Sequence, residues 1–276
     1  MMVRMSVVFA LFFCTLDAAS LEGNFGFERS QWVDTLNGEH RSTAHAMRDS
    51  HRHPYQTLVF FGLEPEDHVV EIWPGGAGWY TEILAPLLRN KGQLTVAHFS
   101  ADSEVGYFVR SHKSFAEKLT KHPTTYNQVL MSVLQPPSDL KITQPGSADK
   151  VLTFRNIHNW IKSGHAEQVF NAMFTALKPG GVLGVVEHRA VAGTSIDEMI
   201  RSGYVTEQYA RQLAERSGFI FVGSSEVNAN IKDSTLHPKG VWTLPPSLRL
   251  GNVDRDRYNA VGESDRMTLK FIKPKK

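Results

Sequence analysis

The stretch HVVEIWPGGAGWYTEIL at residues 68–84 decides the fold that this sequence predicts. Its segment 69–73 is short, apolar and β-prone, as expected of a strand buried on both faces of a parallel sheet. The glycine-rich turn 74–78 follows, and residues 79–85 begin a helix. A strand, a glycine turn and a helix form a unit that binds phosphate or carboxylate groups, because the ligand approaches bare backbone and the helix N-terminus offers unpaired N–H groups.

Three interpretations of this turn compete. A phosphate-cradling P-loop requires Lys-Ser or Lys-Thr directly after the last glycine, but Trp79 and Tyr80 stand there, so this interpretation is excluded. A dinucleotide fingerprint, Gly-x-Gly-x-x-Gly, is half met by Gly76 and Gly78. The third interpretation uses Glu71, an acid inside the strand that can accept hydrogen bonds from the turn and meet a ligand's ammonium group. Nicotinamide-binding turns have no need of such an acid.

The acid and its spaced glycines resemble the first motif of the class I S-adenosylmethionine (SAM)-dependent methyltransferases. Within that class, EIWPGGAGWYTEILAP and later segments look like a family of exported, predicted methyltransferases of unassigned substrate, over residues 27–274. One departure is Trp73, which stands where the class often has its first glycine. The resemblance implies that SAM is the cofactor and that its amino-acid end is held by Glu71, Gly75, Gly76 and Gly78.

The second strand, residues 93–99, departs from the class at its end. Dinucleotide folds and methyltransferases usually place an acid there to bind ribose hydroxyls, but this chain has His98. Either Ser100 or Asp102 reaches the sugar, or the pocket holds it differently. The third strand, 128–134, is followed by no acid for the adenine amino group, so Gln135 or backbone would have to serve.

Polar side chains follow the fourth strand, 151–154, and the fifth, 182–186. The carboxyl ends of parallel strands meet at one edge, where ligands bind, so we expect both sets to face the methyl group. Our hypothesis makes His158 the general base, because a neutral imidazole takes a proton near pH 7. Asn156 would orient the acceptor, and Glu187 would set the imidazole tautomer or stabilise positive charge. The alternative is that these residues only cap the next helix or orient other groups.

Strands and helices alternate along the chain, which predicts a parallel sheet with right-handed crossovers. The last segment, 266–272, alternates between apolar and polar residues, as an antiparallel strand with one exposed side would. With the resemblance, this implies an α/β, Rossmann-like class I methyltransferase fold: a mostly parallel seven-stranded sheet with an antiparallel last strand.

The chain divides into three parts. Residues 1–20 resemble a signal peptide. Residues 21–63 are predicted to be helical, with a break at Pro54 and a lid over the cofactor cleft as their functional alternative; their candidate core residues are Trp32, Ala44, Met47, Leu58 and Phe61. Residues 64–276 are expected to form the methyltransferase-like domain. The long, mostly irregular loop 226–265 is rich in Asn, Asp, Pro and Gly and is expected to be functional or to cover the substrate.

The N-terminus predicts export to the periplasm or outside the cell. Arg4 precedes about ten apolar residues ending at Cys14, and small residues follow, which is the signal-peptide pattern and too short for a membrane span. Cys14 is the only cysteine, so the mature protein would have no disulfide. The net charge of +2 gives no argument for nucleic acid, and His51 and His53, two apart on a helix, point in different directions, so no metal site is predicted. The oligomeric state stays open.

These features favour SAM-dependent methyl transfer to an unidentified small molecule. A non-catalytic ligand-binding module on the same fold is one alternative, favoured by His98 and by the missing adenine acid. A nicotinamide-dependent oxidoreductase is a second alternative, disfavoured by Glu71 and Trp73.

The first prediction concerns export. Protein produced in a bacterial host should have a mature N-terminus near Ser20 or Leu21, because small residues follow the apolar segment there. Mass spectrometry of the intact protein measures this directly. An intact Met1 on cytosolic protein would contradict the predicted signal peptide.

Overall fold

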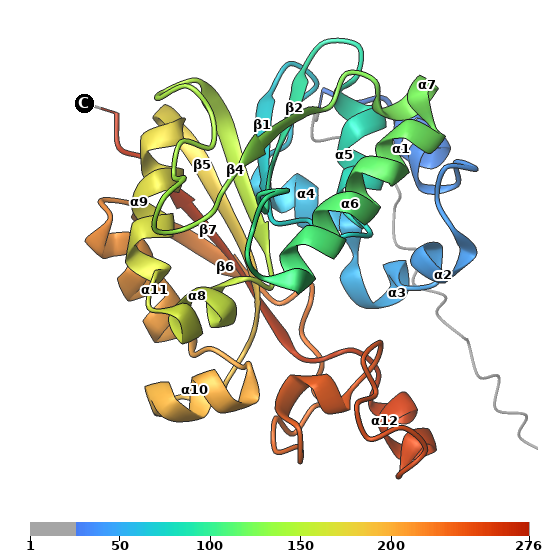
Figure 1. The fold of residues 1–276 in the computed structure, drawn as a ribbon, viewed down its shortest axis with the longest axis vertical. Helices are drawn as coiled ribbons and strands as arrows, with labels where there is room; N and C mark the ends of the chain where they lie inside the picture. Colours follow the sequence, from blue (N-terminus) through green and yellow to red (C-terminus); the bar gives the residue numbers. More distant parts are fainter. Residues whose placement is uncertain (1–25, 276) are drawn as a thin grey trace, which may run out of the picture.

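Residues 26–275, which the computed structural model describes, contain one seven-stranded sheet; the predicted signal peptide lies outside them. The spatial strand order is β3-β2-β1-β4-β5-β7-β6 (Figure 1). The strands are β1 (His68–Ile72), β2 (Gln93–His98), β3 (Leu130–Val133), β4 (Ala148–Phe154), β5 (Leu177–His188), β6 (Ile220–Ser225) and β7 (Arg266–Ile272).

Strand β7 runs against its two neighbours, whereas β1 to β5 pair in parallel. The predicted fold class is therefore confirmed, including the antiparallel last strand, whose predicted bounds match. The carboxyl ends of the parallel strands and the start of β7 meet at the lower edge of Figure 1. We call this the carboxyl edge.

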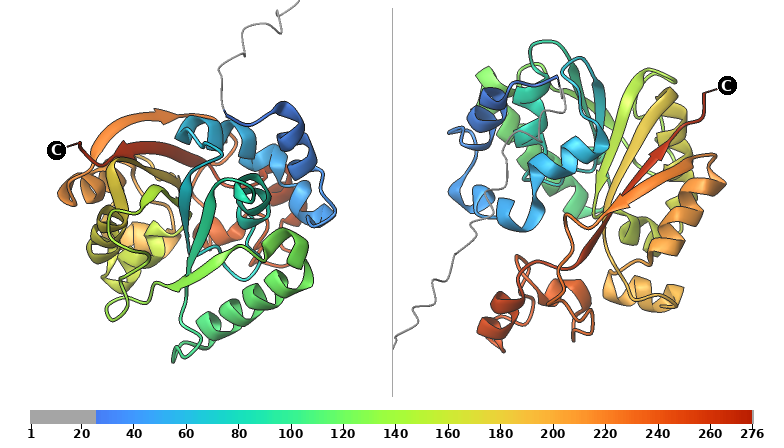
Figure 2. Two further views of the ribbon diagram at one scale, coloured as in Figure 1. Left: turned by 90° about the horizontal axis from the view of Figure 1, so that it is seen from above. Right: turned by 180° about the vertical axis from the view of Figure 1, so that it is seen from behind.

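Helices cover both faces of the sheet (Figures 1 and 2). One face carries α8 (Ile157–Ser163), α9 (Ala166–Ala176) and α11 (Glu207–Arg216). The other carries α1 (Arg29–Leu36), α4 (Pro54–Phe61), α5 (Thr81–Leu88), α6 (Gly106–Lys121) and α7 (Pro123–Tyr126). The remaining short helices are α2 (Thr43–Ala46), α3 (Asp49–Arg52), α10 (Ile196–Ser202), the 3-10 helix η2 (Gly240–Thr243) and α12 (Arg255–Val261).

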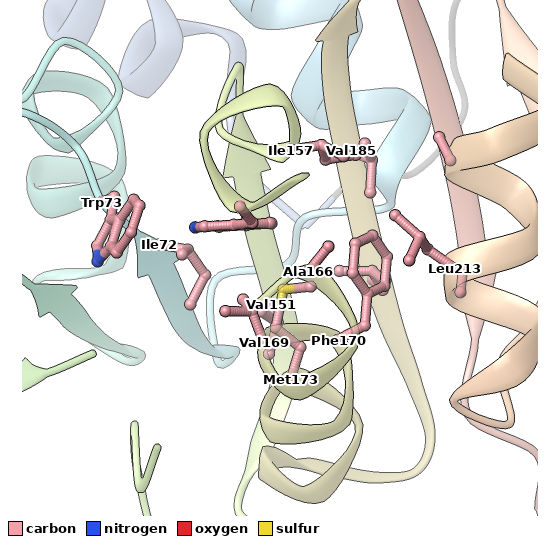
Figure 3. Close-up of a cluster of buried hydrophobic side chains, with 14 of the residues drawn as sticks. Ile72, Trp73, Val151, Ile157, Ala166, Val169, Phe170, Met173, Val185 and Leu213 are labelled. Carbon is pink, nitrogen blue, oxygen red and sulfur yellow. The ribbon is translucent and has the colours of Figure 1, made fainter. Parts of the chain in front are cut away.

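The apolar residues of the central strands explain why two helical layers form. In β1, Val69 packs into one core and Val70 and Ile72 into the other, so the strand is buried on both faces. Figure 3 shows Val151 of β4 and Val185 of β5 among the side chains of α9. Burial of apolar area on both faces then fixes the sheet between the layers.

The N-terminal segment is mostly part of the core. Trp32, Leu58 and Phe61 are buried, as predicted, and α4 packs against β5 and β7. The predictions for Ala44 and Met47 were wrong: both are exposed, because α2 is a single short helix at the surface. Pro54, predicted to break a helix, instead begins α4, where its missing N–H costs no hydrogen bond.

The predicted loop 226–265 contains η2 and α12 and is anchored by buried polar side chains. The Asn228 side chain donates to the hydroxyls of Thr57 and Thr268, both at 2.9 Å. Asp233 accepts hydrogen bonds from Tyr204 and His237 at 2.9 and 2.7 Å. None of the described helices is long and apolar enough to cross a membrane.

The second prediction tests the packing of α4 on the sheet. A Cβ at Gly184 of β5 would lie 2.7 Å from a Leu152 methyl carbon and 2.8 Å from the Phe61 ring. Gly184→Ala should therefore lower the free energy of unfolding by about 1–3 kcal/mol, the usual cost of overpacking. Urea unfolding of the purified variant measures the change.

The matched control is Gly223→Ala in β6, where a Cβ would meet no atom within 4 Å. Its free energy of unfolding should stay the same or rise by less than about 1 kcal/mol, because alanine restricts the unfolded chain. Equal losses of stability in the two variants would contradict the packing of Phe61 against Gly184.

Candidate active site

The glycines of the turn after β1 each have a local structural reason. Gly75 and Gly78 have φ values of 71° and 56°, which favour glycine. Gly76 lies against α6, since a Cβ there would be 3.2 Å from the Cβ of Ser114. A Cβ at Gly78 would be 2.6 Å from the Phe115 ring. The left-handed backbone at Gly75 and Gly78, and the close packing of Gly76 and Gly78 against α6, therefore explain the glycines of this turn.

Glu71 lies in β1, behind the turn, and is only 1% exposed. Its Oε2 accepts a hydrogen bond from the Thr81 hydroxyl at 2.6 Å, which joins the strand to the first turn of α5. Burial raises the pKa of Glu71 to about 7, against the opposing effects of Thr81 and Lys118. The carboxyl group therefore links β1 to the start of α5 inside the protein.

His98, at the position of the expected ribose acid, is fully buried. The Phe99 N–H donates to its Nδ1 at 2.8 Å, so the ring proton lies on Nε2 and points to the Gly75 carbonyl at 3.4 Å. Burial lowers the pKa of His98 to about 4, so the ring is neutral at pH 7. Of the predicted sugar ligands, Ser100 is half-buried and Asp102 is exposed, with the Asp102 N–H donating to the Ser100 hydroxyl at 3.2 Å.

Trp73 follows β1 with a left-handed φ of 45° and is 8% exposed. Its indole N–H donates to the Leu134 carbonyl, beyond β3, at 2.9 Å. The ring centroid lies 4.6, 5.8 and 5.7 Å from those of Phe99, Phe108 and Trp160. These four residues form an aromatic cluster from the segments that follow β1, β2 and β4, and Figure 3 shows Trp73 beside Ile72.

The position of the aromatic cluster matters for the binding of SAM. The turn, with Glu71 behind it, has the composition that the amino-acid end of SAM requires. The ribose and adenine of nucleotide ligands lie beyond the end of the second strand, where this chain packs Trp73, Phe99 and Phe108. The holding of SAM by Glu71 and the turn glycines therefore stays a prediction, and the end of the second strand is filled by the packed Trp73, Phe99 and Phe108 rings.

The structure brings Glu187 and His158 together. Glu187 is fully buried, and its Oε2 accepts the Ile157 N–H at 2.6 Å. Its Oε1 accepts from Nδ1 of His158 at 3.1 Å and from the His188 N–H at 2.9 Å. The carboxylate thus places the His158 proton on Nδ1 and leaves Nε2 as the basic atom.

Asn156 lies at the same edge but uses its amide within the fold. Its Nδ2 donates to the Ile72 carbonyl at 2.9 Å and to the Thr153 hydroxyl at 3.2 Å, which joins β1 to β4. The orientation of an acceptor by this amide, expected from the sequence, stays a prediction.

His158, Glu187 and His188 have the composition of a metal centre, since each offers one ligand atom within 4.8 Å of the others. The hydrogen bonds argue against a cation, because Glu187 already accepts three N–H groups. Burial lowers the pKa of His188 well below its usual value, and the positive charges of His158 and the nearby Arg155 lower it further. The same positive charges oppose the binding of a cation. We therefore assign no metal to this trio.

An arginine cluster beside the rim was missed by the sequence reasoning. Glu263 accepts from Nε of Arg48 at 2.6 Å and from Nε of Arg52 at 3.1 Å, and Arg266 lies 3.2 Å away. Arg155, after β4, has a left-handed φ of 64°, and burial lowers its pKa to about 10. The only local signal was the i, i+4 spacing of Arg48 and Arg52, which places both on one helix face.

The predicted lid segment is fastened beside the turn. Glu82 of α5 accepts from His45 at 2.9 Å and contacts Lys118 of α6, while the Trp79 indole donates to the His45 carbonyl at 3.0 Å. A cavity of about 460 Å³ lies between these elements, with Gly76 in its wall. A lid role for this segment stays a prediction.

No protein-family model and no curated protein matches the chain. A SAM-dependent methyltransferase from Aquifex aeolicus is 12% identical, with a TM-score of 0.54 over 90% of this chain and 99% of the other. The [4+2]-cyclase SpnF is 15% identical, with a TM-score of 0.54 over 82% and 81%. Haemonchus contortus phosphoethanolamine N-methyltransferase 2, in complex with SAM, is 15% identical, with a TM-score of 0.53 over 81% and 53%.

At these identities the likeness shows the fold alone. The chain has the class I fold of SAM-dependent methyltransferases. Because a cyclase has a similar fold, the reaction must be argued from the site.

The third prediction concerns the buried carboxyl of Glu71. Its pKa rises from 4.5 in the unfolded chain to about 7 in the folded protein, so the folded protein binds the proton more tightly. Stability should therefore fall as the pH rises from about 5 to 7, by up to about 3 kcal/mol for a shift of this size. Glu71→Gln removes this titration, so the variant's stability relative to the parent should increase with pH.

Chemical unfolding at several pH values measures this difference. The matched control is Glu66→Gln, which changes an exposed carboxyl and should leave the pH profile unchanged. A stability difference between Glu71→Gln and the parent that stays constant across this range would contradict a buried, protonated Glu71.

Proposed function

We propose that the chain transfers a methyl group from SAM to a small acceptor at the carboxyl edge. The observation that carries this proposal is that two groups of residues with suitable chemistry lie at the carboxyl edge of a class I fold. The glycine turn follows β1, His158 lies in α8 directly after β4, and its partner Glu187 lies at the end of the adjacent strand β5. Bound SAM would supply an electrophilic methyl group, and the protein would hold the acceptor in line and exclude water.

His158 is the proposed general base in this arrangement. Glu187 fixes its tautomer, and the free Nε2 can take a proton from an acceptor that loses one. We propose that Asn156 acts by holding the ends of β1 and β4 together, so that turn and rim keep their spacing. Export, the lid and the sugar contacts of Ser100 and Asp102 remain parts of this proposal.

The second candidate function is ligand binding without methyl transfer. The aromatic cluster supports it, because a buried indole stands where the methyltransferase class often has a glycine. The nicotinamide alternative gains no support from the comparisons.

The fourth prediction tests both functions through Trp73. Titration calorimetry should show that the parent binds SAM and S-adenosylhomocysteine but not NAD. Trp73→Gly should bind SAM at least about tenfold more tightly, a gain of about 1.4 kcal/mol, because no indole has to be displaced. Glycine also suits the left-handed φ at this position.

The control is Trp32→Ala, which removes an equally buried indole in α1 and should leave SAM affinity unchanged. Binding by Trp73→Gly and not by the parent would favour the second candidate. An absence of SAM binding by both proteins would rule out the proposed methyl transfer.

A further inference from the structure

The arginine cluster, defined by Arg48, Arg52, Arg155 and Arg266, contains more positive charge than its surroundings neutralise. Glu263 is the one carboxylate that the described residues pair with it, and it binds three of the four guanidinium groups. Although burial raises the pKa of Glu263, these guanidinium groups hold it well below its usual range. The carboxylate is therefore ionised and already shared.

Several donors of the cluster have no acceptor. Both Nη1 and Nη2 of Arg52 are buried without a hydrogen-bond partner among the described residues, and so is Nη2 of Arg48. Arg52 is only 1% exposed, and its guanidinium lies over the Trp79 ring at 4.7 Å. No hydrogen bond or ion pair of the Arg155 side chain is found in the described part of the chain. Unpaired buried charge is costly, so this arrangement points to a missing anion.

The cluster adjoins the rim of the proposed active site. Arg155 directly precedes Asn156 at the end of β4, and Arg266 pairs with His188 in the register of β5 and β7. Arg155 and Arg48 are half-buried, so the cluster reaches the surface. A ligand held here would lie beside His158 and His188.

We propose that the arginine cluster binds a phosphate-like dianion, such as the phosphate group of a small molecule. Planar guanidinium groups bind tetrahedral oxyanions with paired N–H donors, and four of them around one carboxylate favour two negative charges over one. The dianion would be part of the methyl acceptor, and only this last step rests on the proposed function. Binding of the anion itself does not require SAM.

The fifth prediction is that inorganic phosphate binds the parent protein and that Arg155→Gln weakens this binding at least about tenfold, by loss of a charge-assisted contact. Calorimetry near pH 7.5, with sodium chloride at matched ionic strength in the reference, measures both. Without phosphate, Arg155→Gln should fold normally, because its side chain makes no hydrogen bond that folding would lose. Arg257→Gln, which removes an exposed guanidinium, is the control and should keep the parent's affinity.

Acetate provides the second arm of the experiment. Acetate binding as tight as phosphate binding would overturn the preference for a dianion. Equal phosphate affinity in Arg155→Gln and the parent, or no phosphate binding by the parent, would overturn the site. SAM titration of the same samples is scored separately, so a protein that binds phosphate but not SAM would refute the methyl transfer and keep this site.

Discussion

The hydrogen bond from the Trp73 indole to the Leu134 carbonyl is the interaction on which the packing at the carboxyl ends of β1, β2 and β3 depends. A non-glycine residue at a left-handed φ costs roughly 1–3 kcal/mol. Burying the indole contributes roughly 1.5–3 kcal/mol, and its contacts with Phe99 and Trp160 add roughly 0.5–1.5 kcal/mol each. The burial and ring contacts of the indole therefore offset the backbone strain at this position.

The carboxyl edge is thereby divided into two environments. Over β1, β2 and β3 it is aromatic and uncharged, since even His98 is neutral and bonded to the turn. Over β4, β5 and β7 it carries the arginine cluster and the two rim histidines. Each half has a left-handed residue directly after the strand at the boundary between them, Trp73 after β1 and Arg155 after β4, and such strain is typical of functional sites.

Much of the fold could be predicted because its signals are local. The apolar β1, the glycine turn and the alternation in β7 each lie within a few residues of sequence. The arginine cluster could not be predicted in this way, because Arg48 and Glu263 are 215 positions apart and neither lies in a recognisable motif. The exposure of Met47 was missed for a related reason: helical spacing does not reveal that a short helix lies at the surface.

The site was predictable in its chemistry but not in the direction of its side chains. Glu187 ends β5 and His158 lies in the first turn of the helix after the adjacent β4, so their approach follows from the topology. The direction of the Trp73 ring instead depends on a left-handed φ that its neighbours in sequence do not specify. In the sequence, Trp73 is a departure from the glycine pattern of the methyltransferase class. In the structure its indole packs against Phe99 and Trp160 and donates a hydrogen bond to the Leu134 carbonyl.

Ligands bound at the two halves of the carboxyl edge would interact through their charges. The sulfonium and ammonium groups of SAM are positive, and the arginine cluster, in which Glu263 pairs with three of the four guanidinium groups, would repel them. A dianion in the cluster would reverse this repulsion. If both proposals hold, each ligand must strengthen the binding of the other by the same factor, because coupling between two binding equilibria is reciprocal. The displacement of Trp73 would then be driven partly by the acceptor, and SAM would be held most tightly when there is an acceptor to methylate.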